Sequence, residues 1–90
     1  MDGGKLSMKI YVDVKTPGNG KTYEFQLDNV MTVGQVKVKM IDEITEIESG
    51  NITLDPKKAI LSNLSTSKRL SDSDLLTDAG VKSGQSLLLL

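Results

Sequence analysis

The chain has 90 residues, 38% of them hydrophobic, and a net charge of −1 from 11 basic and 12 acidic side chains. Proteins that bind nucleic acid usually carry an excess of basic residues that neutralises the phosphates. The near-equal numbers of basic and acidic side chains therefore argue against nucleic acid as the main partner. Cysteine and histidine are both absent, which excludes disulfides, thiol chemistry and the usual proton shuttle in catalysis.

Residues 1–7 contain two glycines and no periodic pattern, which predicts a flexible leader or a cloning remnant before a single domain over residues 8–90. Apolar and polar residues alternate over residues 8–15 and again over residues 22–28, which is the period of half-buried strands. Between them, a proline and an Asn-Gly pair within residues 16–20 favour a tight reversal. The domain is therefore predicted to begin with a β-hairpin.

The period of the pattern changes after the hairpin. Apolar side chains recur at steps of three and four, which predicts one buried helical stripe made of Val33, Val36, Met40, Ile44 and Ile47. Thr32 is expected to cap the N-terminus of this helix, with Gln35 completing a capping box. Ser49-Gly50 is expected to end it, with Gly50 in a left-handed conformation. Gly34 lowers the helix propensity, so we expect packing on the hairpin to stabilise the helix.

The elements beyond residue 50 are short and separated by turns. We expect a strand over residues 52–54, a return strand over residues 59–61, a polar loop over residues 62–69, a single helical turn within residues 70–76 capped by Ser71 or Asp72, and a last strand over residues 85–90. The predicted order of elements is ββαβββ.

This order, with one helix across a mixed sheet, resembles the β-grasp arrangement of the ubiquitin family. The resemblance covers residues 8–90 and departs most over residues 49–68. It rests on Met8-Lys9-Ile10-Tyr11-Val12, Gly20-Lys21-Thr22, the helix start Thr32-Val33-Gly34-Gln35-Val36, Arg69-Leu70-Ser71-Asp72 and Ser86-Leu87-Leu88-Leu89-Leu90. It implies an α+β fold, a ubiquitin-like β-grasp in which four to five strands form a mixed sheet with one helix packed across it.

Ubiquitin continues past its last strand into a flexible tail ending in Gly-Gly, which is joined to lysines. This chain ends at Leu90 within the predicted strand, so we expect it not to act as a conjugated modifier. Residues 79–90 resemble the ending of YukD and EsaB, tail-less ubiquitin-like proteins of bacterial type VII (Esx) secretion. That resemblance implies a cytoplasmic accessory or regulatory factor of such a system. The alternative is a modifier, or a ubiquitin-like domain of a larger protein, whose chain continues beyond Leu90.

The acidic and hydroxyl side chains do not form a recognisable reaction site. No serine lies beside a plausible base, and the acidic residues of the helix are interpreted as an ordinary solvated surface. Asp72 and Asp74 are interpreted as cap and loop carboxylates, because a calcium loop needs more oxygens at fixed spacing. We therefore expect no enzyme activity, no metal and no cofactor. No segment is long and apolar enough to cross a bilayer, so we also expect no membrane insertion.

The closing leucines motivate the binding hypothesis. Alternation along the last strand turns Leu87 and Leu89 toward the helix, and Leu88 and Leu90 toward the opposite, open face of the sheet. The resemblance to ubiquitin implies a recognition patch on that face, and the candidate protein-binding residues are Ile52, Leu54, Leu88 and Leu90. The alternative is that the loop over residues 62–69 or edge contacts cover the leucines. The expected function is binding of a protein partner through the open sheet face, with no oligomeric state implied.

Overall fold

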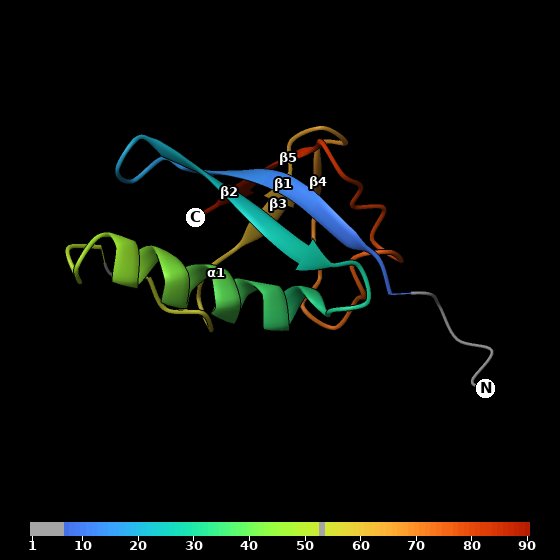
Figure 1. The fold of residues 1–90 in the computed structure, drawn as a ribbon, viewed down its shortest axis with the longest axis horizontal. Helices are drawn as coiled ribbons and strands as arrows, with labels where there is room; N and C mark the ends of the chain where they lie inside the picture. The colour runs from blue at the N-terminus through green and yellow to red at the C-terminus, as the bar shows by residue number, and fades with distance from the viewer. Residues whose placement is uncertain (1–6, 53) are drawn as a thin grey trace.

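The computed structural model describes residues 7–52 and 54–90. One helix packs across one face of a mixed five-stranded sheet (Figure 1). The elements in chain order are β1 (Lys9–Thr16), β2 (Lys21–Asp28), α1 (Val33–Ile47), β3 (Leu61–Asn63), β4 (Lys68–Arg69) and β5 (Ser86–Leu89). This arrangement confirms the predicted α+β fold and its ββαβββ order.

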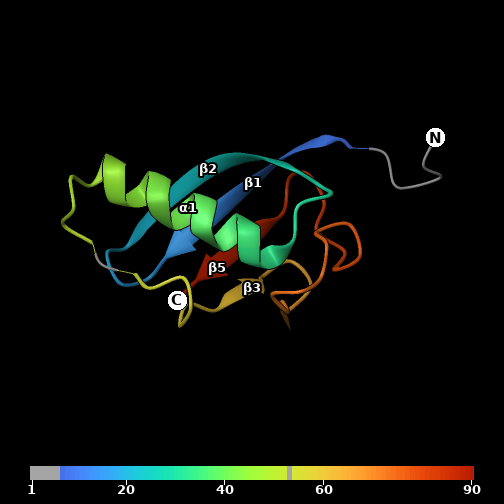
Figure 2. The same cartoon turned by 90° about the horizontal axis from the view of Figure 1, so that it is seen from below.

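The strands lie in the sheet in the order β2-β1-β5-β3-β4. β1 pairs antiparallel with β2 and parallel with β5, with Val14 opposite Leu87. On its other side β5 pairs antiparallel with β3, which pairs with the two-residue β4. The last strand of the chain is therefore at the centre of the sheet, as Figure 2 shows beneath the helix.

The first hairpin follows the predicted alternation with one correction. Ile10, Val12 and Val14 are buried, and the four-residue turn closes with amides of Asn19 and Gly20 donating to the Thr16 carbonyl at 3.2 and 3.0 Å. Met8 was expected on the buried face but is 58% exposed. The reason is its register, because the β1–β2 pairing begins only at Lys9, so Met8 lies beyond the sheet.

The helix begins as predicted, with Thr32 as N-cap and Gln35 completing the capping box. Four residues of the predicted stripe are fully buried: Val33, Val36, Met40 and Ile44. Ile47 was expected in this stripe but is 61% exposed. It is the last helical residue, and the hairpin presents polar groups of Lys21 and Tyr23 to the adjacent Glu48. Polar contacts thus occupy the end of the helix next to Ile47, whose side chain stays exposed.

The helix ends in a Schellman motif. The amide of Ser49 donates to the Glu46 carbonyl at 3.2 Å, and the amide of Gly50 donates to the Thr45 carbonyl at 2.9 Å. The predicted stop is confirmed at this point, and Gly50 has a positive φ of 79°. The preceding Ser49 is also left-handed, with a φ of 54°, although its side chain disfavours that region.

The segment between helix and β5 differs most from the predictions. Ile52 and Leu54 are not in a strand, and Thr53 lies outside the described residues. The third strand is β3, two residues later than the expected return strand, and the expected loop over residues 62–69 contains the end of β3 and all of β4. Residues 70–76 form turns and an isolated bridge between Leu75 and Thr32, without the expected helical turn.

The carbonyls of that turn segment cap the helix N-terminus. Val33 donates its amide to the Asp74 carbonyl at 2.8 Å, and Gly34 donates to the Asp72 carbonyl at 2.9 Å. Both donors belong to the first turn of the helix, where amides have no partner within the helix. A Cβ at Gly34 would approach the Asp72 carbonyl oxygen to 3.3 Å, so glycine permits this close contact. The hydrogen bonds to the helix N-terminus thus hold residues 72–74 in their turn conformation.

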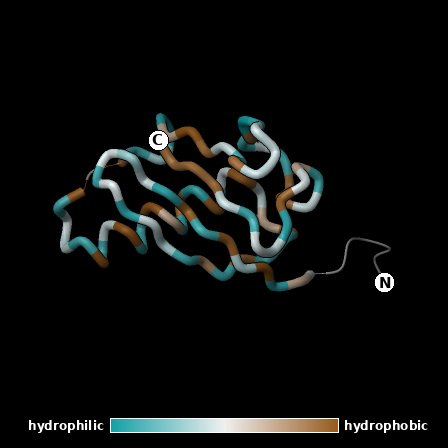
Figure 3. Tube along the Cα trace, turned by 90° about the horizontal axis from the view of Figure 1, so that it is seen from above, coloured by the Kyte–Doolittle hydropathy of each residue, from teal (hydrophilic) through white to brown (hydrophobic). Residues whose placement is uncertain are grey.

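The core between sheet and helix is aliphatic, with Phe25 its only buried aromatic side chain among the described residues. Leu87 and Leu89 are 0% and 1% exposed, which confirms the predicted alternation of the last strand. Figure 3 shows this leucine run as the brown stretch that ends the chain. In the described part of the chain, no helix has the length and apolarity needed to cross a membrane.

Replacing Ser49 with glycine should stabilise the protein, because glycine adopts the left-handed conformation without a side-chain penalty. We expect Ser49→Gly to raise the free energy of unfolding by about 0.5–1 kcal/mol, measured by urea denaturation. Ser73→Gly is the matched control, because Ser73 lies in an exposed turn without a positive φ. There glycine should only raise the conformational entropy of the unfolded chain, which lowers the free energy of unfolding. An equal destabilisation by both substitutions would contradict the assignment.

Candidate functional site

The two outward leucines lie on the open sheet face, Leu88 within the central strand β5 and Leu90 at its end. Leu88 is half-buried and lies opposite Ser62 of β3, whereas Leu90 is 53% exposed just beyond β5. Leu90 and Ile60 exchange both backbone hydrogen bonds at 2.9 Å, which extends the β3–β5 ladder by one pair. By alternation Ile60 faces the same side as Leu88 and Leu90, and it is half-buried. Sequence reasoning missed Ile60 because it placed the third strand at residues 52–54.

Ile52 and Leu54 lie elsewhere, packed against the core beneath the end of the helix. They line a cleft of about 480 Å³ whose apolar wall also includes Leu89 and Leu90. Three of the four predicted residues, Ile52, Leu54 and Leu90, therefore meet in one cleft. Leu88 lines a separate, shallower hollow of about 280 Å³ beside the hairpin turn. The open face and the cleft adjoin at Leu90.

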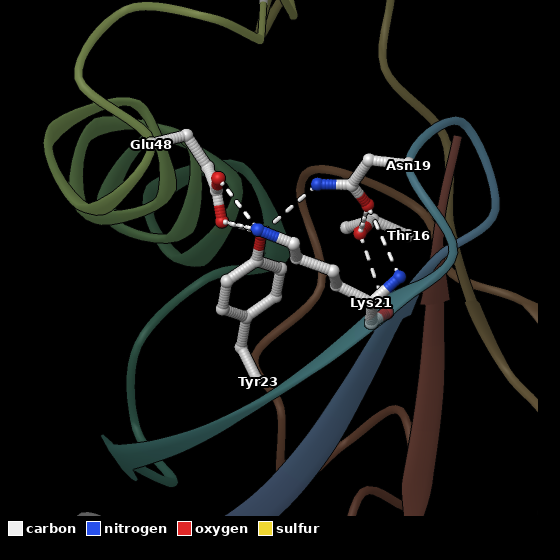
Figure 4. A network of polar contacts seen from close by, with 5 residues as sticks. All are labelled: Thr16, Asn19, Lys21, Tyr23 and Glu48. Carbon is white, nitrogen blue, oxygen red and sulfur yellow. Dashed lines mark hydrogen bonds and ion pairs between the residues drawn. The ribbon is translucent and has the colours of Figure 1, made fainter.

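Figure 4 shows a polar network, and four of its five residues form the polar rim of this cleft: Thr16, Asn19, Lys21 and Glu48. The Lys21 ammonium donates to both carboxylate oxygens of Glu48 at 2.8 and 2.9 Å, and the Tyr23 hydroxyl donates to Glu48 Oε2 at 2.6 Å. Asn19 donates its side-chain amide to the Tyr23 hydroxyl at 3.0 Å, and the Thr16 hydroxyl donates to Asn19 Oδ1. These contacts join the hairpin turn to the helix C-terminus, and sequence patterns gave no sign of them because the partners are distant in the chain.

The network favours the ionised forms of Lys21 and Glu48 and the neutral form of Tyr23. Hydrogen bonds from Lys21 and Tyr23 hold the pKa of Glu48 below its usual 4.5, and the hydrogen bond to Glu48 raises the pKa of Lys21. Burial, followed by the hydrogen bond to Glu48, raises the pKa of Tyr23. At neutral pH Glu48 is a carboxylate with a low affinity for protons, which suits a structural contact better than general-base chemistry.

No metal site is apparent in residues 7–52 and 54–90, because no three His, Cys, Asp or Glu side chains lie close enough together to hold an ion. Asp72 is ion-paired with Lys37, with 2.9 Å between Asp72 Oδ1 and Lys37 Nζ. Asp74 contributes its backbone carbonyl to the helix cap. The site that the described residues form is thus an apolar surface with a polar rim, an arrangement suited to binding.

Neither a protein-family model nor a curated protein sequence matches the chain. Its structure is similar to a ubiquitin-like domain of an Arabidopsis thaliana protein, with TM-score 0.69 and 22% identity, covering 100% of this chain and 84% of that one. It is similar to the ubiquitin of Caldiarchaeum subterraneum, with TM-score 0.67 and 22% identity over 91% of each chain. An N-terminal ubiquitin-like domain of another protein gives TM-score 0.68 and 25% identity, covering 100% and 82%.

These comparisons show that the chain has the ubiquitin-like β-grasp fold. They lend no support to the narrower resemblance to YukD and EsaB. At this level of identity the likeness carries the fold alone, so the function has to be argued from the surface of the chain itself.

The Lys21–Glu48 contact should make stability depend on acid pH. Because the pKa of Glu48 is lowered in the folded state, its contribution is present above the usual value of 4.5 and is lost as the pH falls through the folded-state pKa. We expect the wild type to lose more stability than Glu48→Gln between about pH 7 and about pH 3, measured by urea denaturation in dilute buffer. The matched control Glu24→Gln removes an exposed carboxylate of β2 and should behave as the wild type does. Equal pH dependence of the wild type and Glu48→Gln would contradict this role.

Proposed function

We propose that this chain is a non-enzymatic protein-interaction domain that binds its partner through the open sheet face around Leu88 and Leu90. The observation that carries the proposal is the placement of these two leucines on the outer side of the central strand. Ile60 lies beside Leu90 and continues the apolar surface. Leu90 is 53% exposed at the junction of this face and the cleft, so a partner that covers it removes apolar surface from water.

Ile52 and Leu54 remain part of the proposed surface as neighbours of Leu90 in the cleft. Both are half-buried against the core, so they contribute shape and apolar area more than freely exposed side chains. The Lys21–Glu48 rim lies across the same cleft and supplies polar groups at its edge. An apolar centre with a polar rim is the usual anatomy of a protein–protein interface.

A narrower proposal concerns the system in which the domain acts. The resemblance of residues 79–90 to the ending of YukD and EsaB favours a cytoplasmic accessory factor of a type VII secretion system. The test is affinity capture from the native cell with the domain as bait. Secretion-system subunits among the captured proteins would support this proposal, whereas ubiquitin-type activating enzymes would support the modifier alternative.

Replacing both outward leucines should abolish partner capture and leave the fold intact. We expect Leu88→Ser/Leu90→Ser to weaken capture at least about tenfold, which corresponds to about 1.4 kcal/mol. Stability should fall by no more than about 2 kcal/mol, because Leu88 is only half-buried and Leu90 is largely exposed. The measurements are quantitative capture and urea denaturation.

The matched control for this double variant is Val38→Ser, because Val38 is 46% exposed on the helix, away from the open sheet face. We expect Val38→Ser to retain capture. Unfolding of the double variant would assign the leucines to the core, and unchanged capture would place the partner elsewhere. Either result would overturn the proposal.

A further inference from the structure

A second cleft, of about 500 Å³, lies where the segment before β3 and the segment after β4 meet the helix. Its polar lining consists of Lys37, Lys57, Lys58, Arg69, Ser71 and Asp72. Four of these six residues are basic, although the whole chain has a net charge of −1. The cleft is therefore a local concentration of positive charge on a nearly neutral protein.

Three of the four cations form no ion pair within the described part of the chain. Lys57, Lys58 and Arg69 are exposed, and in residues 7–52 and 54–90 none of them makes an ion pair. The fourth, Lys37, is 4% exposed and is neutralised by Asp72. Lys68, the other residue of β4, is also exposed but does not line the cleft.

The walls of this cleft are held by backbone and buried contacts. Lys37 Nζ donates to the Ala59 carbonyl at 2.6 Å and contacts both oxygens of Asp72, at 2.9 and 3.1 Å. This single ammonium therefore joins the helix to the two segments that form the cleft. Arg69 pairs with Ser62 in the sheet, and the Lys58 amide donates to the Asp55 carbonyl at 2.9 Å. The backbones that carry the cations are thus positioned before any ligand binds, which lowers the entropic cost of binding.

We propose that this basic cleft binds an acidic segment of a protein partner. Carboxylates of the segment would pair with Lys57, Lys58 and Arg69, and the Arg69 guanidinium can hold one carboxylate through two parallel hydrogen bonds. Ser71 offers a hydroxyl donor at the same wall. Ile60 and Leu70 also line the cleft and provide a place for one apolar side chain.

A protein segment fits this cleft better than a nucleic acid. The cleft has no aromatic side chain on which a base could stack, and the chain's net negative charge repels a long polyanion. Its three exposed cations suit a short acidic stretch, and its apolar residues suit a peptide side chain. The inference rests on the proposed function and deepens it, because Ile60 lines the cleft and also pairs with Leu90 on the open face. One partner chain can run from the leucine surface into the basic cleft.

The test is fluorescence anisotropy with a short labelled peptide rich in Glu and Asp that contains one leucine. We expect the protein to bind this peptide, with an affinity that falls as salt rises from about 50 mM to about 500 mM, because exposed ion pairs are screened. A peptide with Gln and Asn in place of the acidic residues should not bind. Absence of salt-dependent binding, or equal binding of the neutral peptide, would overturn the inference.

Two charge-reversal variants test whether the acidic peptide binds in this cleft. Lys57→Glu/Arg69→Glu should weaken peptide binding at least about tenfold, because each substitution removes an attraction and adds a repulsion. The matched control, Lys9→Glu/Lys82→Glu, makes the same change in net charge at exposed lysines that line neither the cleft nor the hollow at Leu88, and it should bind within about twofold of the wild type. Equal losses for the two variants would overturn the inference, since they would show a general charge effect. Equally tight binding of a single-stranded DNA oligonucleotide would overturn it as well.

The leucine variant distinguishes this inference from the function on which it rests. Leu88→Ser/Leu90→Ser should retain binding of the acidic peptide while it loses capture of the native partner. If the leucine variant keeps partner capture, the proposed function fails, whatever the peptide result. If the peptide fails to bind the wild type while capture still depends on the leucines, only the basic cleft is overturned.

Discussion

The parallel pairing of β1 with β5 is the contact on which the rest of this structure depends. It joins residues 13–15 to residues 86–88, so almost the whole chain is closed into a loop by one short ladder. The hairpin is attached to one side of this pair, and β3 with β4 is attached to the other. Without it the sheet would divide into two small antiparallel units, each too small to bury a core alone. Leu87 and Leu89 stabilise this ladder by filling the space beneath the helix.

The central place of β5 also determines what the surface offers. A central strand has both edges paired, so its only free surface is the face turned away from the helix. Leu88 occupies that face with Ser62 opposite it, and Leu90 lies just beyond the end of the strand. Leu88 of the proposed binding surface therefore stands on a strand that is paired along both edges, and the Leu90 backbone is paired with Ile60. A partner that binds there meets a rigid surface and pays little entropy to order it.

Although the chain is nearly neutral, its charges are unevenly distributed over the surface. Lys21 and Glu48 neutralise one another where the hairpin turn meets the end of the helix. At the start of the helix, the carbonyls of Asp72 and Asp74 satisfy the first amides while the Asp72 carboxylate neutralises buried Lys37. The Asp72 carboxylate, which lines the basic cleft, is paired with Lys37, and in residues 7–52 and 54–90 it forms no ion pair with Lys57, Lys58 or Arg69. The basic cleft is thus a consequence of how the polar contacts are distributed, since the overall composition shows no basic excess.

The sequence by itself determined the features that depend on neighbouring residues. Alternation located the hairpin and divided the closing leucines correctly, and the capping box at Thr32 and Gln35 marked the start of the helix. Only the tertiary structure decided that Ile47 is exposed, that Ile52 and Leu54 lie outside the sheet, and that Ile60 is the neighbour of Leu90. Periodicity describes one segment at a time. Which segment becomes the third strand, and what covers a helix end, depends on contacts between residues far apart in the chain.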